Sequence, residues 1–582
     1  MAVENLITEH IDVWTSAVQT KSTSGRGSSK KLELYGVKKL RELILELAVR
    51  GKLVPQDPND EPASVLLERI AQEKAQLVKE KKIKKPKKLP NISDEEKPFD
   101  LPNGWKWVRF PDVAHYGPGK TPATKNSLYW DETGSGIPWV SIADLNDKST
   151  VSVSTKKVSD IAVEQVFKRT PIPAGTMLMS FKLTVGKASI LNVDAFHNEA
   201  IISVFPYTGV LQSYLFKVLP SRANSGNKKN AIMGFTLNAE SLSLLTIPLP
   251  PEAEQHRIVD KVDELMALCD QLEQQTEDSI EAHQVLVTTL LDTLTNSADA
   301  DELMQNWARI SEHFDTLFTT EESIDQLKQT ILQLAVMGKL VPQDPSDEPA
   351  AELLKRIAEE KAQLVKDKKI KKQKALPPIA EDEKPFELPS GWEWCYLQDL
   401  FSVVTDGDHQ APPKSDEGIP FLVIGNLNTG HIQFEGCNYV PAQYFDKLDW
   451  TRQPSKGDLL YTVTGSYGIP ILVTEDVPFC VQRHVAILNS TADTPVEYIQ
   501  YVLRSKYSFD FATSVATGIA QKTVPLTGLR KMPIPLPPLK ERSEILQMIA
   551  ALIGVCEQLK VSIRDSQTNQ LHLTDAIIEQ VV

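Results

Sequence analysis

The side chains with the clearest chemical pattern are the glycine, lysine and threonine that close "AHYGPGKT", residues 114–121. They fit the loose pattern of a phosphate-binding loop, in which backbone N–H groups, a lysine and a hydroxyl surround a nucleotide phosphate and its Mg²⁺. Such a loop follows a strand and opens a helix. The next residues, "PATKNSLYWDETGSGIPWV", lack an apolar period of 3.6 and are typical of a loop. A chance match is the favoured interpretation, and a nucleotide-dependent P-loop enzyme stays open as an alternative.

Other patterns of catalytic or metal-binding residues are missing from the sequence. It contains no H-E-x-x-H or G-x-S-x-G motif, and its ten histidines are scattered. None of its Pro-Pro pairs follows Asp or Asn, as an adenine methyltransferase needs in the loop that holds the flipped base. The five cysteines are far apart, which argues against disulfides and zinc and for a reducing compartment: Cys269, Cys395, Cys437, Cys480 and Cys556. We expect no catalytic residue, no metal site and no cofactor bound by this chain.

Length and composition indicate a globular protein of several domains. The 582 residues are 41% hydrophobic and 24% charged. The acidic start "MAVENLITEHIDVW" is not a signal peptide, and no apolar run approaches the roughly 18–20 residues of a membrane span. We therefore expect a cytoplasmic protein. The net charge of −14 is unevenly spread, with about 14 Lys and Arg against 10 acids in residues 108–246, and about 10 against 14 in residues 395–533. Charge thus supports DNA contact weakly, and only for the first segment.

The sequence contains a long internal repeat. "LAVRGKLVPQDPNDEPA" at Leu47 returns as "LAVMGKLVPQDPSDEPA" at Leu334, 287 residues later, and about 48 of the 68 positions from Leu40 to Trp107 are identical in the second copy. The match ends after "GWKW" and "GWEW" and resumes at the same offset with "IPLPP". The repeat divides the chain into shared and variable segments. These segments are 1–107 (shared), 108–246 (variable), 247–394 (shared), 395–533 (variable) and 534–582 (shared).

The two variable segments differ in sequence but keep parallel landmarks. "SGIPWVSIADL" at Ser135 resembles "EGIPFLVIGNL" at Glu417, and both are typical of a strand. "AGTMLMSFKLTVGKASIL" at Ala174 resembles "KGDLLYTVTGSYGIPILV" at Lys456, each with the pattern of a strand, a glycine turn and another strand. We predict two mixed α/β domains of one fold whose surfaces have diverged.

The shared segments are predicted to be helical. Apolar residues recur in steps of four and three after each "IPLPP", as in the seam of a coiled coil. They are Ile258, Val262, Leu265, Cys269 and Leu272 in the first copy, and Ile545, Ile549, Leu552, Cys556 and Leu559 in the second. The equivalent helix of the other repeat is the expected partner of each seam, and packing within its own domain is the alternative. The first copy alone carries the polar insertion "QTKSTSGRGSSKK", which predicts a flexible loop.

These features together resemble one family, the specificity (S) subunit of type I restriction–modification systems. The motifs are the duplicated "LPxGWxW" opening, the divergent segment and the "IPLPPxxEQxxIV"-like start of a helix. The resemblance covers nearly the whole chain. It implies a non-catalytic subunit whose variable segments are target-recognition domains, each reading one half of a split, asymmetric DNA site.

The resemblance also implies a fold and a set of partners. The fold is α+β (mixed α/β), with two target-recognition domains separated by long helices that form an antiparallel coiled-coil-like spacer with internal pseudo-twofold symmetry. The partners are double-stranded DNA, two adenine-N6 methyltransferase subunits docked on the helical regions, and motor-nuclease subunits. S-adenosylmethionine belongs to the methyltransferase, and ATP and Mg to the motor-nuclease subunit. A coiled-coil scaffold with no DNA role is a further alternative.

In this family, polar loops beside the glycine-turn strands and before "IPLPP" face DNA. The first domain then offers Lys120, Thr121, Lys182, Lys187, Asn227, Lys228, Lys229 and Asn230. The second offers His409, Gln410, Ser466, Tyr467, Arg483, His484, Gln521, Lys522 and Thr523. Lysine and arginine suit phosphates, and amides suit base edges. For each single residue, a solvated loop position is the competing interpretation.

Two basic runs, "KEKKIKKPKK" and "KDKKIKKQK", lie in the shared segments at the same place in each repeat. Because they are alike, they cannot encode two different half-sites. A solvated helix end or linker is the favoured interpretation, with sequence-independent phosphate contact or methyltransferase docking as the alternative.

Overall fold

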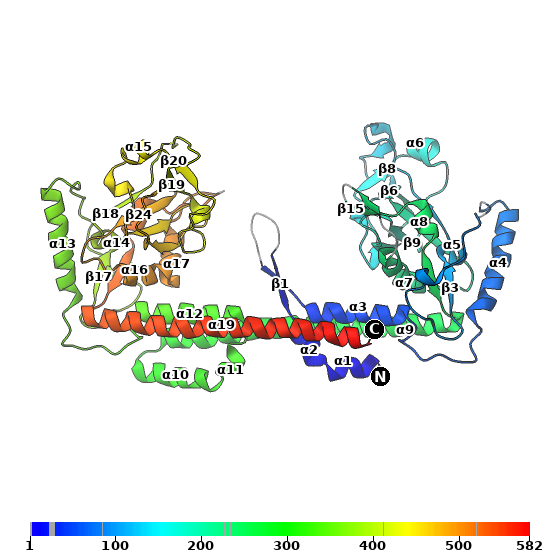
Figure 1. Ribbon diagram of the computed structural model, residues 1–582, viewed down its shortest axis with the longest axis horizontal. Coiled ribbons are helices and arrows are strands. Elements are labelled where there is room, and N and C mark those ends of the chain that lie inside the picture. Colours follow the sequence, from blue (N-terminus) through cyan, green and yellow to red (C-terminus); the bar gives the residue numbers. More distant parts are fainter. Residues whose placement is uncertain are drawn as a thin grey trace. The chain divides into compact units, whose positions relative to one another are not determined.

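The computed structural model describes residues 3–22, 30–83, 85, 87–225, 229–231, 234–410, 412–519 and 521–581, and its elements are labelled in Figure 1. The chain forms two compact units: unit 1 comprises Met1–Asp278 and Gln567–Val582, and unit 2 comprises Ser279–Ser566. Two long helices, α9 (Glu252–Asn296) and α19 (Leu539–Val581), each begin in one unit and end in the other. Each unit therefore combines one variable segment with helical sequence from both repeats.

The two variable segments have the same fold, as predicted. The main sheet has the strand order β4-β13-β9-β11-β7 in the first domain and β18-β24-β21-β22 in the second. The smaller sheets, β12-β6-β8-β5 and β20-β19-β23, also correspond. The strands of the first domain are β3 (Lys106–Arg109), β4 (Ala114–Pro118), β5 (Trp130–Asp131), β6 (Ile137–Val140), β7 (Ser149–Val151), β8 (Lys156–Val158), β9 (Met177–Ser180), β10 (Lys182–Leu183), β11 (Ala188–Leu191), β12 (Phe196–His197), β13 (Ile201–Pro206), β14 (Lys229–Ala231), β15 (Gly234–Thr236) and β16 (Thr246–Leu249). Those of the second are β17 (Glu393–Tyr396), β18 (Val403–Asp406), β19 (Ile419–Leu422), β20 (Asn438–Val440), β21 (Leu459–Thr462), β22 (Pro470–Leu472), β23 (Cys480–Val481), β24 (Val485–Asn489) and β25 (Pro533–Leu536).

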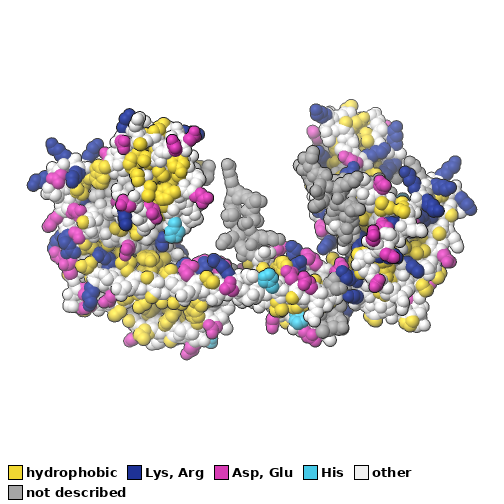
Figure 2. All heavy atoms as spheres, in the orientation of Figure 1, with side chains coloured by type: hydrophobic (Ala, Val, Ile, Leu, Met, Phe, Trp, Pro, Cys, Tyr) yellow, Lys and Arg dark blue, Asp and Glu magenta, His cyan; other side chains and the backbone are white. Residues whose placement is uncertain are grey.

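The helices belong to the domains and to the shared regions. In unit 1 they include α1 (Val3–Glu9), α2 (Ile11–Ser16), α3 (Tyr35–Val49), α4 (Ala63–Lys79), α5 (Phe110–Val113), α6 (Asp160–Ala162), α7 (Gln212–Ser225) and α8 (Ala239–Ser243). In unit 2 they include α10 (Ala300–Glu312), α11 (Phe314–Leu317), α12 (Glu321–Val336), α13 (Ala350–Lys366), α14 (Leu397–Leu400), α15 (Ala442–Phe445), α16 (Val496–Arg504), α17 (Lys506–Val515) and α18 (Leu526–Arg530). Helices α4 and α13 are equivalent, and Figure 2 shows Lys and Arg side chains gathered around the upper end of each.

Each variable domain begins and ends on one two-stranded sheet that lies at the boundary between shared and variable sequence. Strand β16, from "TIPL", pairs antiparallel with β3, from "KWVR", so that Ile247 lies opposite Val108. Strands β25 and β17 repeat this pairing, with Ile534 opposite Cys395. The chain therefore leaves each domain beside its point of entry. This arrangement lets the sequence between the two strands diverge without moving either end.

In both repeats, a buried glutamate of the long helix is hydrogen-bonded to the shared residues next to this two-stranded sheet. In unit 1, Glu254 at the start of α9 accepts hydrogen bonds from Trp105 Nε1 (2.9 Å) and Gln56 Nε2 (3.1 Å). In unit 2, Glu541 of α19 accepts the same bonds at 3.0 and 3.3 Å, from the indole of the second "LPxGWxW" motif and the amide of the second "GKLVPQ". Burial raises the pKa of Glu254 and of Glu541. Three shared motifs that are far apart in sequence thus meet at one buried group.

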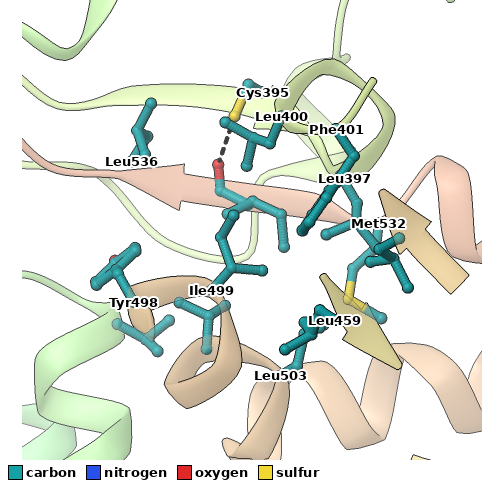
Figure 3. Close-up of a cluster of buried hydrophobic side chains, with 14 of the residues drawn as sticks. Cys395, Leu397, Leu400, Phe401, Leu459, Tyr498, Ile499, Leu503, Met532 and Leu536 are labelled. Carbon is teal, nitrogen blue, oxygen red and sulfur yellow. Dashed lines mark hydrogen bonds between the residues drawn. The ribbon is translucent and has the colours of Figure 1, made fainter. Parts of the chain in front are cut away.

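The core of the second domain continues into these helices. Figure 3 shows Tyr498, Ile499 and Leu503 of α16 packed toward the side chains of β17, β25 and α14. The same cluster contains residues of α12 and the first turns of α19, including Ile545 and Ile549. Because one continuous apolar core joins the sheet to the helices, the recognition domain of unit 2 is held rigidly on its helical support.

The helical seams are buried, as predicted, but against more than one helix. Cys556, with the partly buried Leu552 and Leu559, packs with residues of α12 and with Val287 and Leu291 at the end of α9. The expected partner, the long helix of the other repeat, therefore shares the seam with α12 of the same unit. In unit 1, Arg41 of α3, the helix equivalent to α12, pairs with two acids of α9, at 2.7 and 2.6 Å. Each seam is covered by a short helix of its own repeat as well.

Two local findings differ from expectation. The polar insertion is not simply a loop, since β1 (Gln19–Ser22) and β2 (Lys30–Glu33) pair as an antiparallel ribbon. Among the described helices, α19 is long and apolar enough to cross a membrane by length and composition, although no continuous apolar run was expected there. Its seam residues Ile545, Ile549 and Cys556 are buried in the cores of unit 2, while 22% of its most apolar 18-residue stretch is buried in all.

Candidate nucleic-acid interface

In the second domain, four loops meet at one end of the main sheet. Strands β18, β24 and β21 are antiparallel neighbours, so the end of β18, the start of β24 and the end of β21 lie side by side. Backbone bonds connect the loops: Gly407 N–H donates to Val485 O (3.2 Å), and Val463 N–H donates to His484 O (3.0 Å). Gly465 N–H donates to Lys522 O (3.0 Å), which adds the loop before α18. We call this surface, residues 407–410, 482–484, 464–468 and 517–523, the loop edge of domain 2.

All nine residues predicted for DNA contact in this domain lie on the loop edge. His409 has 60% of its side chain exposed, and Gln410, Ser466, Arg483, Gln521 and Lys522 are exposed as well. Tyr467 is half-buried, because its ring stacks on Phe509 with centroids 5.6 Å apart and its hydroxyl bonds Thr513 Oγ1 at 3.0 Å. The edge therefore combines exposed polar side chains, of which His409 contacts Asp406 at 3.0 Å, with one fixed aromatic ring.

His484 has the properties of a base-edge reader more than of a phosphate contact. Burial lowers the pKa of this imidazole, and the neighbouring charge of Arg483 lowers it further. The ring is therefore mainly neutral near pH 7, and its Nε2 already accepts a hydrogen bond from Arg483 Nε at 3.4 Å, which leaves Nδ1–H as a donor. Arg483 itself, which is exposed and permanently charged, suits a phosphate or a guanine edge.

One group of supporting residues was missed by the sequence reasoning. Arg452, in the turn Trp450–Arg452, donates from Nη1 to Gly407 O (3.3 Å) and to Asp408 Oδ1 (3.2 Å). Tyr444 donates its hydroxyl to the other oxygen of Asp408 at 2.9 Å. Burial tends to raise the pKa of Asp408, but these hydrogen bonds and the Arg452 charge lower it overall. The network fixes the loop that carries His409 and Gln410, and nothing in the local sequence around Arg452 signals it.

The first domain builds the same edge from different residues. Lys120 follows β4 as Asp408 follows β18, and its N–H donates to His197 O at 2.9 Å. The turn after β9 pairs with the segment before α8 through β10, β15 and β14, which aligns Lys182, Thr236 and Lys229 in one row. In domain 2 the corresponding contacts are two isolated bridges, at Thr464, Thr517 and Thr523.

The remaining residues predicted in the first domain fall into different environments. Thr121 donates its hydroxyl to the Glu199 carboxylate, and Lys120 Nζ donates to Val166 O at 3.0 Å on the surface. Lys187 is partly buried and its Nζ donates to Ile142 O at 3.3 Å, which gives it a structural role beside the turn. Lys229 and Asn230 belong to strand β14. Asn227 and Lys228 lie outside the described residues.

The Gly-Lys-Thr stretch is not a phosphate-binding loop. Residues Ala114–Pro118 form strand β4, and the N–H groups of Gly119 and Lys120 already donate to Ile201 O and His197 O. The next helical element is a single 3₁₀ turn, Ser127–Tyr129. A nucleotide phosphate would find neither free N–H groups nor a helix N-terminus, so the P-loop interpretation fails.

Comparison with known proteins decides the family. The family model described as "Type I restriction modification DNA specificity domain" matches residues 102–282 and again residues 389–565. The chain is 42% identical to the specificity subunit of the type I restriction enzyme EcoAI of Escherichia coli, and the match covers 100% of both chains. It is 43% identical to the EcoEI specificity subunit of the same organism, over 100% of this chain and 99% of that one.

The chain belongs to the type I restriction–modification specificity subunits. Its two variable segments are the DNA-recognition domains of such a subunit. Among solved structures, it is similar to a chain of a type I restriction–modification complex (16% identity, TM-score 0.45, covering 83% of this chain and 99% of that chain). It is also similar to the HsdS subunit from Thermoanaerobacter tengcongensis (17% identity, TM-score 0.37, covering 84% and 98%).

Proposed function

We propose that each half of a bipartite, asymmetric DNA target is read by the loop edge of one recognition domain. The observation that carries the proposal is that the predicted contact residues of domain 2, drawn from four separate segments, meet at one end of one sheet. Domain 1 presents equivalent loops with different side chains. A common scaffold with exchanged side chains is what two readers of different sequences require.

The shared helices are proposed to dock two adenine-N6 methyltransferase subunits. Two exposed apolar positions recur at the offset of the repeat: Leu268 with Val555, and Leu286 with Leu573, each about half exposed (46%, 52%, 50% and 47%). By unit, one member of each pair lies in unit 1 and the other in unit 2. A surface that is present twice suits a partner that binds twice. Exposed apolar positions of this kind mark protein interfaces when they are grouped.

Catalysis is proposed to lie with the partners. The methyltransferase subunits would bind S-adenosylmethionine and flip the target adenine, and motor-nuclease subunits with ATP and Mg would join the complex for cleavage. The specificity subunit itself would act in the cytoplasm without catalysing either step. Its sequence supports this division, because no Pro-Pro pair in it follows Asp or Asn.

Mapping N6-methyladenine in cells that produce this chain and its methyltransferase tests the proposal. We expect methylation within one split motif whose two halves are unrelated in sequence. A second arm uses Leu268→Asp with Val555→Asp, which should abolish co-purification of the methyltransferase. The matched control is Met548→Asp, at an exposed apolar position whose equivalent in the first repeat is Lys261. Methylation without a motif would refute the reading role, and unchanged co-purification would refute the docking surface.

A further inference from the structure

The basic segment that follows α13 is anchored to the protein in a way that leaves its lysine side chains exposed. In unit 2, Ile370 is buried, with 8% exposure, and Gln373 Nε2 donates to Ser402 O at 3.0 Å. The lysines around these two anchors are all exposed: Lys368, Lys369, Lys371, Lys372 and Lys374. Within the described part of the chain, none of the five forms an ion pair. The segment therefore holds five positively charged side chains at exposed positions.

Unit 1 has a similar group of exposed lysines after α4. Lys81, Lys82, Lys85, Lys87 and Lys88 are exposed, and Lys82 pairs with Glu80 at 2.8 Å. Lys81 and Lys368 occupy equivalent positions and share a left-handed backbone, with φ of 57° and 58°. Helices α4 and α13 therefore end in the same turn, and the basic segment leaves both in the same direction relative to its helix. Figure 2 shows the Lys and Arg side chains around both ends.

In unit 2 the basic segment lies beside the loop edge. Trp450 Nε1 donates to Lys369 O at 3.1 Å, and Arg452, two residues later, donates to Gly407 O and Asp408 of the loop edge. Gln373 bonds Ser402, which precedes β18, the edge strand of the main sheet, and therefore lies at the end of that strand opposite the loop edge. The order along this surface is therefore basic segment, turn 450–452, residues 407–410, residues 482–484 and residues 464–468. The start of the basic segment, at Lys369, therefore lies beside the loop edge, and the rest of the segment runs along the outer strand β18.

From this juxtaposition in unit 2, and from the similar exposed lysines of unit 1, we infer that the lysines of residues 368–374, and equally Lys81, Lys82, Lys85, Lys87 and Lys88, bind DNA phosphates next to the half-site read by their own domain, without regard to sequence. The inference rests on the proposed loop edge as the reading surface. Lysine side chains at exposed positions contact phosphates as point charges and carry no base code. Because both repeats present the same residues, they cannot distinguish the two half-sites, whereas the phosphate backbone is alike at both. Two nearby acids, Asp367 and Asp449, reduce this positive charge but do not cancel it.

The test uses the complex of the full chain with its methyltransferase subunit and a duplex that carries the mapped target. The variant replaces Lys368, Lys369, Lys371, Lys372 and Lys374 with Gln, and the matched control replaces the same five with Arg. We expect the slope of log affinity against log salt to fall by about 0.9 for each lost phosphate contact, or roughly two to four in total. Affinity for target and for unrelated DNA should fall by the same factor, so that their ratio is kept. The Arg control should behave as wild type.

Phosphate ethylation interference locates the contact. The Gln variant should lose interference at phosphates flanking one half-site, and a second variant, with Gln at the exposed lysines of unit 1 (Lys81, Lys82, Lys85, Lys87 and Lys88), should lose it at the other. A wild-type salt slope in both variants would overturn the inference. Loss of the methyltransferase from the complex, with unchanged DNA affinity of what remains, would overturn it in favour of a protein-docking role. Gln521→Ala in the same assay keeps the two proposals separate, because it tests the loop edge alone.

Discussion

The two recognition domains share one scaffold and differ at the edge that faces the proposed target. In domain 1 the turn after β9 is widened into a three-stranded ribbon, β10-β15-β14, with Lys182 and Lys229 in one row. In domain 2 the same place holds bridges between threonines and the stacked pair Tyr467 and Phe509. The first edge is rich in lysine and the second in uncharged polar and aromatic groups. Both domains nevertheless keep the same closing pairs of strands, β3 with β16 and β17 with β25.

The largest effect is expected from exchanging residues 108–246 for the corresponding segment of a related specificity subunit. One half of the methylated motif should change completely, while the other half stays as it was, because β3 and β16 keep the domain on the same helices. Methylome mapping of cells with the chimaera measures this. A simultaneous change of both halves would show that the domains do not read independently.

A half-chain of residues 1–303 should form a dimer that methylates a palindromic split site. In the full chain, Gln567–Val582 completes unit 1, and residues 280–295 are its equivalent at the repeat offset. A second half-chain can therefore supply the missing helix end by twofold pairing. Sedimentation gives the oligomeric state and methylome mapping the motif. A fragment that folds but remains monomeric at micromolar concentration would contradict the equivalence of the repeats.

Arg452→Met should weaken recognition of the half-site read by domain 2. The change leaves Asp408 without its guanidinium partner and releases the loop of His409 and Gln410, at a cost of roughly 1–3 kcal/mol in DNA binding, or about ten- to a hundredfold. Affinities for duplexes with one half-site mutated measure the effect. Arg452→Lys, which keeps the charge, should lose less. Equal loss at both half-sites would argue for general damage to the fold.

Gln521→Ala and Lys522→Ala should each affect the same half-site by a smaller or similar amount. Loss of a base contact should cost about 1–3 kcal/mol and relax specificity, whereas loss of a phosphate contact should lower affinity evenly for all sequences. The control is Lys506→Ala, which removes an exposed lysine that pairs with Asp510. If both variants bind as wild type does, this loop is not part of the interface.

The smallest effect concerns a pair that differs between the two repeats. Arg109 holds Glu96 by two bonds, of 2.7 and 2.9 Å, and lowers the pKa of Glu96 to about 2, helped by the backbone N–H of Ser93. Because the pKa is lowered in the folded state, this stabilisation is complete above the unfolded value of 4.5 and is lost as the pH falls toward 2. Arg109→Met should therefore lower the Tm by a few degrees at pH 7 and by less at pH 3, in thermal unfolding of the full chain. The equivalent change in the second repeat, Tyr396→Phe, removes a hydrogen bond to Glu383 but no charge. The loss of Tm that it causes should therefore not become smaller at pH 3 through the loss of an ion pair.

The repeat, the position of the strands and the course of the long helices followed from sequence alone. A short apolar run before a glycine turn and an apolar period of about 3.6 are local properties, so residues such as Met177–Ser180 or Ile258 and Val262 indicate their element without knowledge of its partners. The recurrence of "IPLPP" and of "GWxW" in both copies likewise marked where each domain is attached. These patterns can be recognised in the sequence because each depends only on residues that are close together in the chain.

Tertiary structure decided which loops meet and which side chains remain free. Arg452 supports a loop about 45 residues away, Lys187 turns inward to the Ile142 carbonyl, and the helical seams are divided between two partners. A buried Glu254 that joins "GKLVPQ" to "LPxGWxW" is equally invisible in either motif. Such contacts depend on strand order and on the packing of separate elements. They therefore cannot be predicted from a periodic pattern in the sequence. The sequence therefore determined the scaffold, and only the packed chain determined the surface that it presents to DNA.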